Sequence, residues 1–351
     1  MSFIKKPQPL RTHLPINNLG LTLRDYEGGM STLCAGCGHD SISAAMAMAF
    51  FELSLPPHRA IKVSGIGCSS KTPAYFLRAS HGMNAVHGRM PAIATGAGAA
   101  NRELALIGVS GDGDSLSIGL GQFAHAMRRN LNMLYVLENN GVYGLTKGQF
   151  SASAEVGTKA KKGQVNRQQP IDPVLTALGA GCTFVARSFS GDKEQLVPLI
   201  KAGLEHRGFA MIDVISPCVT FNDHEGSMKS YAYTREASQE LVHADYVPHA
   251  QPIEVSLADT GVTPVTLHDG SHILLRKTDE DYDPGDRAGA FAKVLTCQEQ
   301  GEIVTGLLYI DAEAPQMHEV NGTVGRALVD VDYSELCPGA DALQALQARM
   351  R

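Results

Sequence analysis

Residues 104–141 read LALIGVSGDGDSLSIGLGQFAHAMRRNLNMLYVLENNG and contain a strand, a helix and a second strand in succession. Leu104–Val109 and Met133–Leu137 are short continuous apolar runs, which are typical of buried strands in a parallel sheet. The amphipathic stretch Leu116–Arg129 predicts the crossover helix between them. This segment therefore predicts one right-handed βαβ unit.

The same alternation continues on both sides of this unit. We expect helices over 41–53, with Asp40 or Ser41 as the N-cap, and over 91–102, 174–178 and 194–206, with strands over 60–64, 182–186 and 209–215. Residues 145–170 are polar and glycine-rich and predict a long loop. The pattern predicts a doubly wound α/β domain with a mostly parallel sheet. We place this domain in residues 1–225, with an irregular arm over 1–33, and expect 226–351 to be an irregular C-terminal extension that contacts a partner.

The composition narrows the class of protein. A chain of 351 residues with 44% hydrophobic content can bury a substantial core. The net charge of −6 argues against nucleic acid as a partner. The N-terminal segment has no signal-peptide pattern, and no stretch approaches the roughly 18 apolar residues that span a bilayer. We therefore expect a cytoplasmic protein without a membrane partner. Its seven cysteines then favour metal or redox chemistry over disulfides.

Polar side chains follow the two strands of the βαβ unit. Asp112 lies directly after the first strand and Asn140 directly after the second. Parallel strands present their carboxyl ends at one sheet edge, so these side chains can converge on one ion. With the backbone carbonyl of Val142, they would supply the hard oxygen ligands that Mg²⁺ prefers. Ordinary strand-to-helix turns are the alternative, but turns alone do not require an acid and an amide at matched positions.

This spacing of Gly111-Asp112-Gly113 and Asn139-Asn140 resembles the thiamine-diphosphate fingerprint of transketolases, decarboxylases and 2-oxoacid oxidoreductases. The resemblance implies a domain of the diphosphate-binding type. It also implies that Asp112, Asn140 and the carbonyl of Val142 bind Mg²⁺ beside the diphosphate.

Four of the cysteines form a second pattern. Cys34 and Cys37 form a CxxC pair, and Cys68 and Cys218 each come just after a predicted strand. If those strands are parallel to the first two, all four sulfurs lie at the cofactor edge. Four thiolates suit zinc or an iron–sulfur cluster, and one pair with two distant single cysteines favours the cluster. The remaining cysteines, Cys182, Cys297 and Cys337, do not belong to this pattern.

Five segments sharpen the resemblance: 34–39, 65–71, 86–89, 143–149 and 216–222. In their order they resemble the β subunits of 2-oxoacid:ferredoxin oxidoreductases. In that family a 2-oxo acid is oxidatively decarboxylated to acyl-CoA and CO₂, with coenzyme A as cosubstrate and ferredoxin as electron acceptor. The resemblance implies that Cys34, Cys37, Cys68 and Cys218 hold a [4Fe–4S] cluster. It also implies an α subunit, an (αβ)₂ heterotetramer, and an activating glutamate supplied by the α chain. We therefore expect this chain alone to be inactive.

Polar residues in and after these motifs are candidate contacts for the cofactor and the substrate. His39 and Lys147 are the catalytic candidates, and Lys147 could pair with a substrate carboxylate. Either residue could instead be structural or solvent-exposed, since a histidine beside a glycine-rich turn often only satisfies the backbone. Cofactor contacts are expected at Ser69, His87, Gly111, Asp112, Gly113, Asp114, Asn140, Val142, Gly144, Leu145 and Thr146.

Two other functional classes remain open at this point. A non-oxidative thiamine-diphosphate decarboxylase subunit would share Asp112 and Asn140 but would not need four gathered cysteines. A non-enzymatic iron–sulfur or zinc scaffold would not bind thiamine. Within the oxidoreductase class, segments 144–149 and 216–222 favour 2-oxoglutarate. Pyruvate and branched-chain or aryl 2-oxo acids remain alternatives, and the sequence does not indicate the physiological direction.

Overall fold

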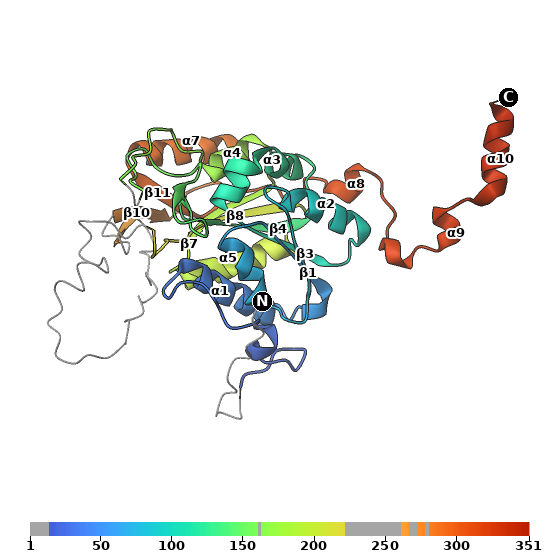
Figure 1. Cartoon of the computed structure of the whole chain (residues 1–351), viewed down its shortest axis with the longest axis horizontal. Coiled ribbons are helices and arrows are strands. Elements are labelled where there is room, and N and C mark those ends of the chain that lie inside the picture. The colour runs from blue at the N-terminus through green and yellow to red at the C-terminus, as the bar shows by residue number, and fades with distance from the viewer. Residues whose placement is uncertain (1–13, 161–162, 222–260, 267–271, 278–280, 351) are drawn as a thin grey trace.

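A nine-stranded sheet forms the centre of the protein, in the order β2-β1-β3-β4-β8-β7-β11-β10-β9 (Figure 1). The computed structural model describes residues 14–160, 163–221, 261–266, 272–277 and 281–350. The predicted boundary after residue 225 and the first 13 residues of the predicted arm lie outside these ranges. In the described part of the arm, Leu23–Tyr26 forms a short 3-10 helix whose Tyr26 is fully buried.

The first six strands in this order are parallel to one another. They are β2 (His81–Asn84), β1 (Ala60–Ser64), β3 (Ala105–Gly111), β4 (Met133–Asn139), β8 (Phe209–Ile215) and β7 (Phe184–Phe189). After β1 the chain adds β2 on one side and then β3 on the other, so the winding direction reverses between β1 and β3. Ligands of such sheets bind outside the carboxyl ends of the strands at this reversal. The predicted doubly wound, mostly parallel sheet is confirmed.

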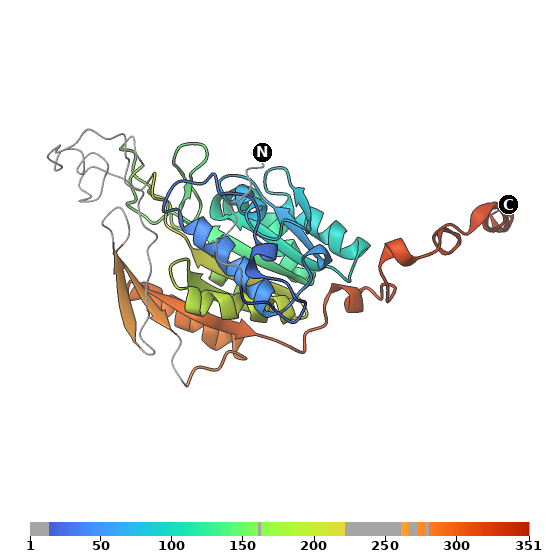
Figure 2. The same ribbon diagram turned by 90° about the horizontal axis from the view of Figure 1, so that it is seen from below.

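Helices cover both faces of the sheet because its strands are apolar on both sides. In β4, Tyr135 and Leu137 belong to one hydrophobic core, and Leu134 and Val136 to the other. The first core packs against α2 (Met90–Ala100), α3 (Leu120–Arg128), α4 (Pro173–Gly179) and α7 (Arg287–Glu299). The second packs against α1 (Gly38–Glu52) and α5 (Lys193–Glu205) (Figures 1 and 2).

Two predicted helices begin differently from the sequence expectation. Helix α1 starts at Gly38, with Cys37 as its N-cap, so the predicted cap at Asp40 or Ser41 is wrong. The CxxC loop therefore runs directly into the helix. The predicted helix 116–129 is divided into a π-helical turn, η4 (Gly113–Ile118), and α3. A π-helical turn is rare and is frequently found at functional sites.

The predicted loop 145–170 is largely irregular, as expected, and a small hairpin overlaps its start. Its strands are β5 (Val142–Tyr143) and β6 (Gln149–Phe150), which pair antiparallel. Two further 3-10 helices lie outside this loop, η2 (Pro57–Arg59) before β1 and η3 (Ser69–Ala74) after it. The hairpin and η3 both start at the carboxyl ends of central strands.

The expectation of an irregular extension over 226–351 is wrong for much of the described C-terminal part. β9 (Val262–Thr266), β10 (His272–Lys277) and β11 (Glu302–Ile310) extend the same sheet, and β11 pairs antiparallel with β7. These strands lacked a clear signal because they lie toward one side of the sheet, where burial is less complete. The division of the chain into two domains at residue 225 stays a prediction.

Residues 317–350 contain α8 (Met317–Val320), η5 (Leu328–Asp330), α9 (Tyr333–Leu336) and α10 (Gly339–Arg349). Helix α8 packs on the body of the molecule, since Met317 belongs to the first core, whereas α9 and α10 extend away from it (Figures 1 and 2). Because β11 runs against β7, the chain enters this segment from the edge opposite the carboxyl ends of the parallel strands. In the described ranges, none of the helices combines the length and the hydrophobicity that crossing a lipid bilayer requires.

Candidate active site

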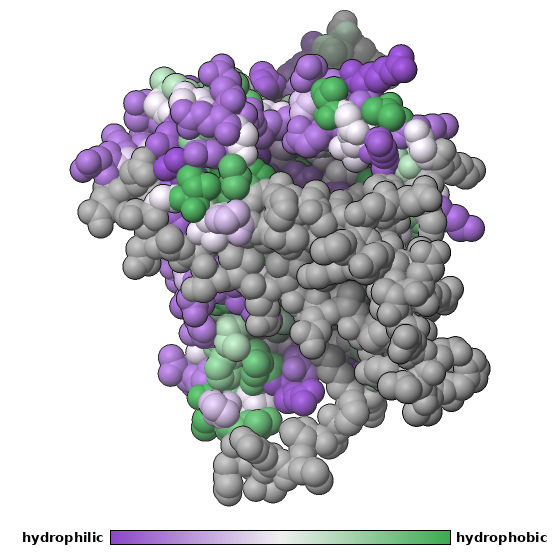
Figure 3. Space-filling view, turned by 90° about the vertical axis from the view of Figure 1, so that its left-hand side faces the viewer, coloured by the Kyte–Doolittle hydropathy of each residue, from purple (hydrophilic) through white to green (hydrophobic). Residues whose placement is uncertain are grey.

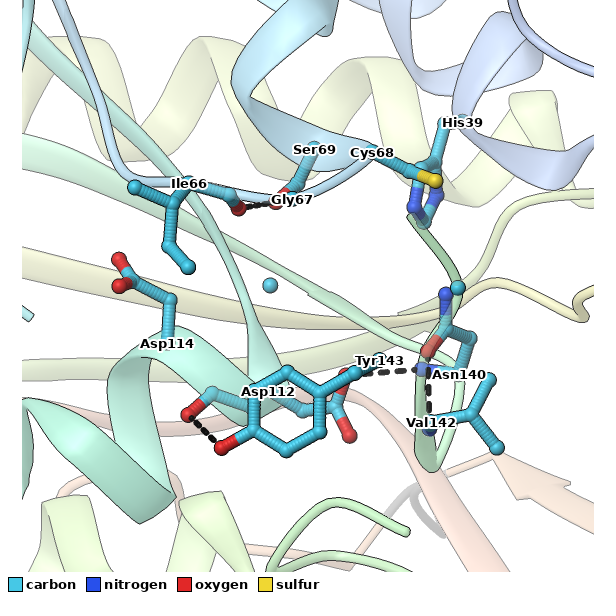
Figure 4. Close-up of a pocket in the computed structure, with 13 residues that line it drawn as sticks. His39, Ile66, Gly67, Cys68, Ser69, Asp112, Asp114, Asn140, Val142 and Tyr143 are labelled. Atoms are coloured by element: carbon cyan, nitrogen blue, oxygen red, sulfur yellow. Dashed lines mark hydrogen bonds between the residues drawn. The ribbon is translucent and has the colours of Figure 1, made fainter. Parts of the chain in front are cut away.

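The carboxyl ends of β1, β3 and β4 surround a hollow of about 310 Å³ (Figure 4). Loops that follow these strands form most of its wall, and His39 comes from the first turn of α1. The hollow is partly open to solvent and lies where ligands of parallel sheets bind, so part of a cofactor can enter it. Its lining residues are His39, Ile66, Gly67, Cys68, Ser69, Gly111, Asp112, Gly113, Asp114, Asn140, Val142, Tyr143 and Gly144.

Asp112 lies at the base of this hollow and is almost fully buried. Its Oδ2 atom accepts hydrogen bonds from the hydroxyl groups of Ser151 and, at 2.6 Å, of Ser153. Its Oδ1 atom accepts a 3.4 Å hydrogen bond from the backbone N–H of Asn140 (Figure 4). Burial raises the pKa of the Asp112 carboxyl, and the hydrogen bonds from the two serines oppose that rise. The two serine hydroxyls thus bind Oδ2, whereas Oδ1 faces Asn140.

The predicted magnesium ligands come together in the structure. The backbone N–H of Val142 donates a 3.0 Å hydrogen bond to Oδ1 of Asn140. This bond holds the Asn140 side chain over the turn that leads to Val142. Carboxylate, amide and backbone oxygens are the donor set that suits Mg²⁺. The donors that surround Asp112 are uncharged, so a cation would offset the cost of burying its carboxylate. The residues present therefore fit a magnesium ion.

Gly113 allows the aromatic ring of Tyr143 to close one side of the hollow. A β-carbon at Gly113 would lie 2.5 Å from the Cε1 atom of this ring, which is too close for any side chain. The Tyr143 hydroxyl donates a 3.0 Å hydrogen bond to the carbonyl of Gly113. The glycine in the GDG motif is thus required by packing within the chain.

Asp114 lines the hollow, but its carboxylate is engaged within the protein. Its Oδ1 atom accepts a 2.6 Å hydrogen bond from the backbone N–H of Gly88, and Oδ2 accepts one of 2.9 Å from Ser110. Asp114 therefore holds the loop that contains His87 against the end of β3.

The four predicted cluster ligands lie around the same sheet edge. A β-carbon on Gly144 would lie 3.3 Å from Sγ of Cys68 and 3.7 Å from Sγ of Cys218, so these sulfurs flank that glycine. The Thr220 hydroxyl donates a 3.0 Å hydrogen bond to Sγ of Cys34, and the backbone N–H of Cys37 donates one to the carbonyl of Cys34. Cys68 and Gly144 also line the hollow beside Asp112.

The four sulfurs influence one another. Burial raises the pKa of the Cys68 thiol to about 11, and the neighbouring Cys218 and Cys34 add to that rise. Within the described part of the chain, no three histidine, cysteine or acidic side chains form a group compact enough for one metal ion. Tetrahedral zinc needs four ligands around one atom, whereas an iron–sulfur cluster spreads its cysteines over several irons. Cysteines contributed by three separate segments around one hollow suit such a cluster.

Several predicted contacts lie outside the hollow. Thr146, Lys147 and His87 are exposed or close to the surface, and Leu145 is 52% exposed. The Thr146 hydroxyl donates to Gln149 within the hairpin. These four residues do not line the hollow in this chain. Any contact that these residues make with cofactor or substrate would lie outside the hollow.

His39 is 1% exposed and lies between the hollow and the core. Its Nδ1 atom is 2.7 Å from the hydroxyl oxygen of Ser216, and burial lowers its pKa to about 4. The ring is therefore neutral at neutral pH and bound to the segment that precedes Cys218. Glu138, 3.6 Å away, is also fully buried, and burial raises the pKa of its carboxyl well above the ordinary value.

Sequence reasoning missed Glu138, Ser151 and Ser153. An acid at the end of the apolar run of β4 was a usable signal, because buried glutamates are rare. The two serines gave no signal, since their loop reaches Asp112 only through folding.

A buried ion-pair network supports the serines from the other side. Arg187 contacts Asp172 and Asp213, each at 2.7 Å. Asp213 accepts a 3.1 Å hydrogen bond from the side chain of Asn139, whose Oδ1 accepts one of 2.9 Å from Ser153. The network therefore connects β7 and β8 to the residues around Asp112.

Comparison with known families agrees with this geometry. Residues 65–214 match the family described as "Thiamine pyrophosphate enzyme, C-terminal TPP binding domain". This range contains the hollow's three loops and both predicted magnesium side chains. The fold and the match together define a thiamine-pyrophosphate-binding domain.

Individual relatives narrow the class further. The chain is 47% identical over 194 residues to subunit beta of 2-oxoacid:ferredoxin oxidoreductase 1 of Aeropyrum pernix, covering 55% of this chain and 60% of that protein. It is 38% identical over 189 residues to 2-oxoglutarate synthase subunit KorB of Methanocaldococcus jannaschii, covering 54% and 69%. The chain belongs to the family of 2-oxoacid:ferredoxin oxidoreductase beta subunits. It aligns with 60–63% of the length of the first relatives that it matches.

A solved structure is similar over a longer range. It is the 2-oxoglutarate:ferredoxin oxidoreductase from Magnetococcus marinus with 2-oxoglutarate, coenzyme A and succinyl-CoA bound. The TM-score is 0.69 with 29% sequence identity, over 92% of this chain and 98% of the other.

Proposed function

We propose that this chain is the cofactor-binding subunit of a thiamine-diphosphate-dependent oxidoreductase that oxidatively decarboxylates a 2-oxo acid. The products would be acyl-CoA and CO₂, with electrons passing through a [4Fe–4S] cluster to ferredoxin. One observation carries the proposal: Cys68 and Gly144 line the same hollow as Asp112 and Asn140, and Gly144 is flanked by two of the cysteine sulfurs. A diphosphate site and a sulfur-rich site in contact suit an enzyme that removes electrons from its cofactor.

Different residues of this chain would hold the metal ion, orient its ligand and hold the cluster. Bound thiamine diphosphate supplies an electron sink for decarboxylation. The oxygens of Asp112, Asn140 and Val142 would hold Mg²⁺ and, through it, the diphosphate. Ser151 and Ser153 would keep the Asp112 carboxylate oriented. Cys34, Cys37, Cys68 and Cys218 would hold the cluster on the adjoining side.

A partner subunit would complete this site. No glutamate is among the described residues that line the hollow, and Glu138 contacts His39 and Thr72 beneath it. The glutamate that activates thiamine would therefore come from an α subunit, within an (αβ)₂ heterotetramer. Figure 3 looks onto the end where the parallel strands finish, and hydrophobic patches stand there among hydrophilic ones. Leu145, Val156 and Val165 of loop 145–170 are exposed apolar residues that a partner could cover.

The proposed substrate is 2-oxoglutarate. Support comes from relatives named as 2-oxoglutarate enzymes in Mycobacterium tuberculosis, at 42% identity over 221 residues, and in Methanocaldococcus jannaschii. Lys147, exposed beyond the hollow, remains the candidate partner for a substrate carboxylate. Pyruvate and branched-chain or aryl 2-oxo acids are the alternatives to test. We also propose a cytoplasmic location, which suits cysteines that must stay reduced.

The decisive experiment is to copurify the complex without oxygen and to assay viologen reduction with coenzyme A and a panel of 2-oxo acids. We expect a brown protein that is bleached by dithionite and is most active with 2-oxoglutarate. The single chain should show no turnover. A colourless complex that releases CO₂ without reducing viologen would instead indicate a non-oxidative decarboxylase.

A further inference from the structure

Four polar side chains are buried between the cysteine loops and the metal end of β4. They are Thr72, Glu138, His39 and Ser216, and none is more than 1% exposed. The Thr72 hydroxyl donates a 3.0 Å hydrogen bond to Oε2 of Glu138. The same Oε2 atom is 3.6 Å from Nδ1 of His39, which is 2.7 Å from the Ser216 hydroxyl oxygen. We call these four residues the buried hub.

Each cysteine-bearing segment contributes one member to the hub. His39 follows Cys37 by two residues, in the first turn of α1. Thr72 lies in η3, whose N-cap is Cys68. Ser216 precedes Cys218 by two residues, and its backbone N–H donates a 2.7 Å hydrogen bond to the carbonyl of Asn139. Three segments far apart in sequence therefore meet at one point.

The fourth member connects this point to the cofactor hollow. Glu138 lies in β4, two residues before Asn140. His39 itself lines the hollow, and Figure 4 shows it beside Cys68 and opposite Asp112. The hub thus lies between the expected position of the cluster and that of the metal.

Burial makes the positions of the three loops interdependent. A polar group that loses its partner in the interior is left unsatisfied, which is costly, so displacing one loop affects the others. The Oε1 atom of Glu138 has no hydrogen-bond partner among the described residues. An apolar residue in β4 would avoid this cost, so a glutamate at this buried position needs a reason beyond packing.

We propose that the buried hub positions the three cysteine loops relative to the strand that presents Asn140, and so fixes the cluster beside the diphosphate site. Glu138, Thr72 and Ser216 are then positioning residues that act through the cysteines. This inference rests on the proposed function in one respect, because it requires that the four cysteines bind a cluster.

The test removes single hub contacts from the assembled complex. Thr72→Val and Ser216→Ala delete one hydroxyl each with little change in volume. Thr183→Val is the matched control, because Thr183 is also buried and hydrogen-bonded, to Asn130 at 2.8 Å, but lies at the opposite edge of the sheet. The measurements are the rate of cluster loss to a ferrous-iron chelator without oxygen and the EPR spectrum of the reduced cluster.

Loss of a residue that orients metal ligands typically weakens metal binding about 10- to 100-fold. We expect cluster loss to accelerate by about this factor in Thr72→Val and Ser216→Ala, with altered EPR spectra, and to be unchanged in Thr183→Val. Glu138→Gln keeps an acceptor for Thr72 and should retain the cluster, whereas Glu138→Met should not. This pair provides a second test if Thr72→Val does not accumulate.

The outcomes separate the two proposals. If Thr72→Val, Ser216→Ala and Glu138→Met lose their clusters no faster than Thr183→Val and give unchanged spectra, the hub is merely structural and the inference is wrong. If the unmodified complex contains no iron or sulfide, the proposed function itself fails, whatever the variants show.

Discussion

Replacing Asp112 with asparagine tests the proposed metal site most directly. Asparagine keeps the shape of the side chain, and its amide oxygen can still accept from Ser151 and Ser153. The variant should therefore fold. The oxygen on the Asn140 side becomes an NH₂ group, which cannot bind a cation.

The magnitude follows from losing a charged ligand in a buried position. A hydrogen bond or ligand contact that involves a charge contributes about 1.5–3 kcal/mol, which corresponds to about a 10- to 150-fold change in affinity. We expect the apparent affinity for Mn²⁺, used in place of Mg²⁺, to fall by at least this factor. Thiamine-diphosphate affinity at limiting metal should fall in parallel.

The assay is titration of the assembled complex, with bound Mn²⁺ followed by EPR and thiamine diphosphate by protein fluorescence. Asp192→Asn is the matched control, because Asp192 is also buried but accepts from Gln195 as the N-cap of α5. That variant keeps an acceptor for Gln195 and should bind metal as tightly as the unmodified complex, because Asp192 does not line the hollow. An Asp112→Asn complex that binds both ligands as tightly as the unmodified complex would refute the site.

Three further outcomes follow from buried groups elsewhere. Arg187→Met should lower the free energy of unfolding by about 3–5 kcal/mol in chemical denaturation, because it leaves the buried Asp213 and the partly buried Asp172 without their cation; a loss below about 1 kcal/mol would contradict this. Burial lowers the pKa of Lys62 to about 8 from its ordinary 10.5, so between these pH values Lys62 holds more protons in the unfolded chain and its contribution to stability should rise with pH. Thermal unfolding across this window should show the stability of the unmodified chain rising relative to that of Lys62→Met, and a constant difference would contradict this. Gly113→Ala should displace Tyr143 and weaken thiamine-diphosphate binding about tenfold, whereas Gly121→Ala, on an open helix surface, should bind normally and be slightly more stable.

The central strands were predictable because both of their faces are buried. A continuous apolar run as short as that of β4, between two turn signals, is typical of a strand covered on both sides. β11 was missed because its burial is mixed along its length, and Gly306 interrupts its apolar run. The start of α1 was misplaced because Cys37, which caps it, makes no side-chain hydrogen bond to the helix and so does not resemble an N-cap.

Site residues were predictable where the order of the strands alone determines their positions. Asp112 and Asn140 follow adjacent parallel strands, so their meeting required only the correct topology. Ser153 and Ser216 reach their partners through loop closure and side-chain direction, which no local pattern specifies. The contacts expected of Lys147 and Thr146 depend on which molecule covers the exposed hairpin, and the sequence of this chain does not specify that molecule.

The antiparallel course of β11 has a practical consequence. It delivers residues 317–350 to the end of the molecule remote from the hollow (Figures 1 and 2). A dye or an affinity handle attached within α10 would therefore stand clear of the route by which small molecules enter. The protein could be immobilised or tracked by that end while the hollow at the other end stays accessible.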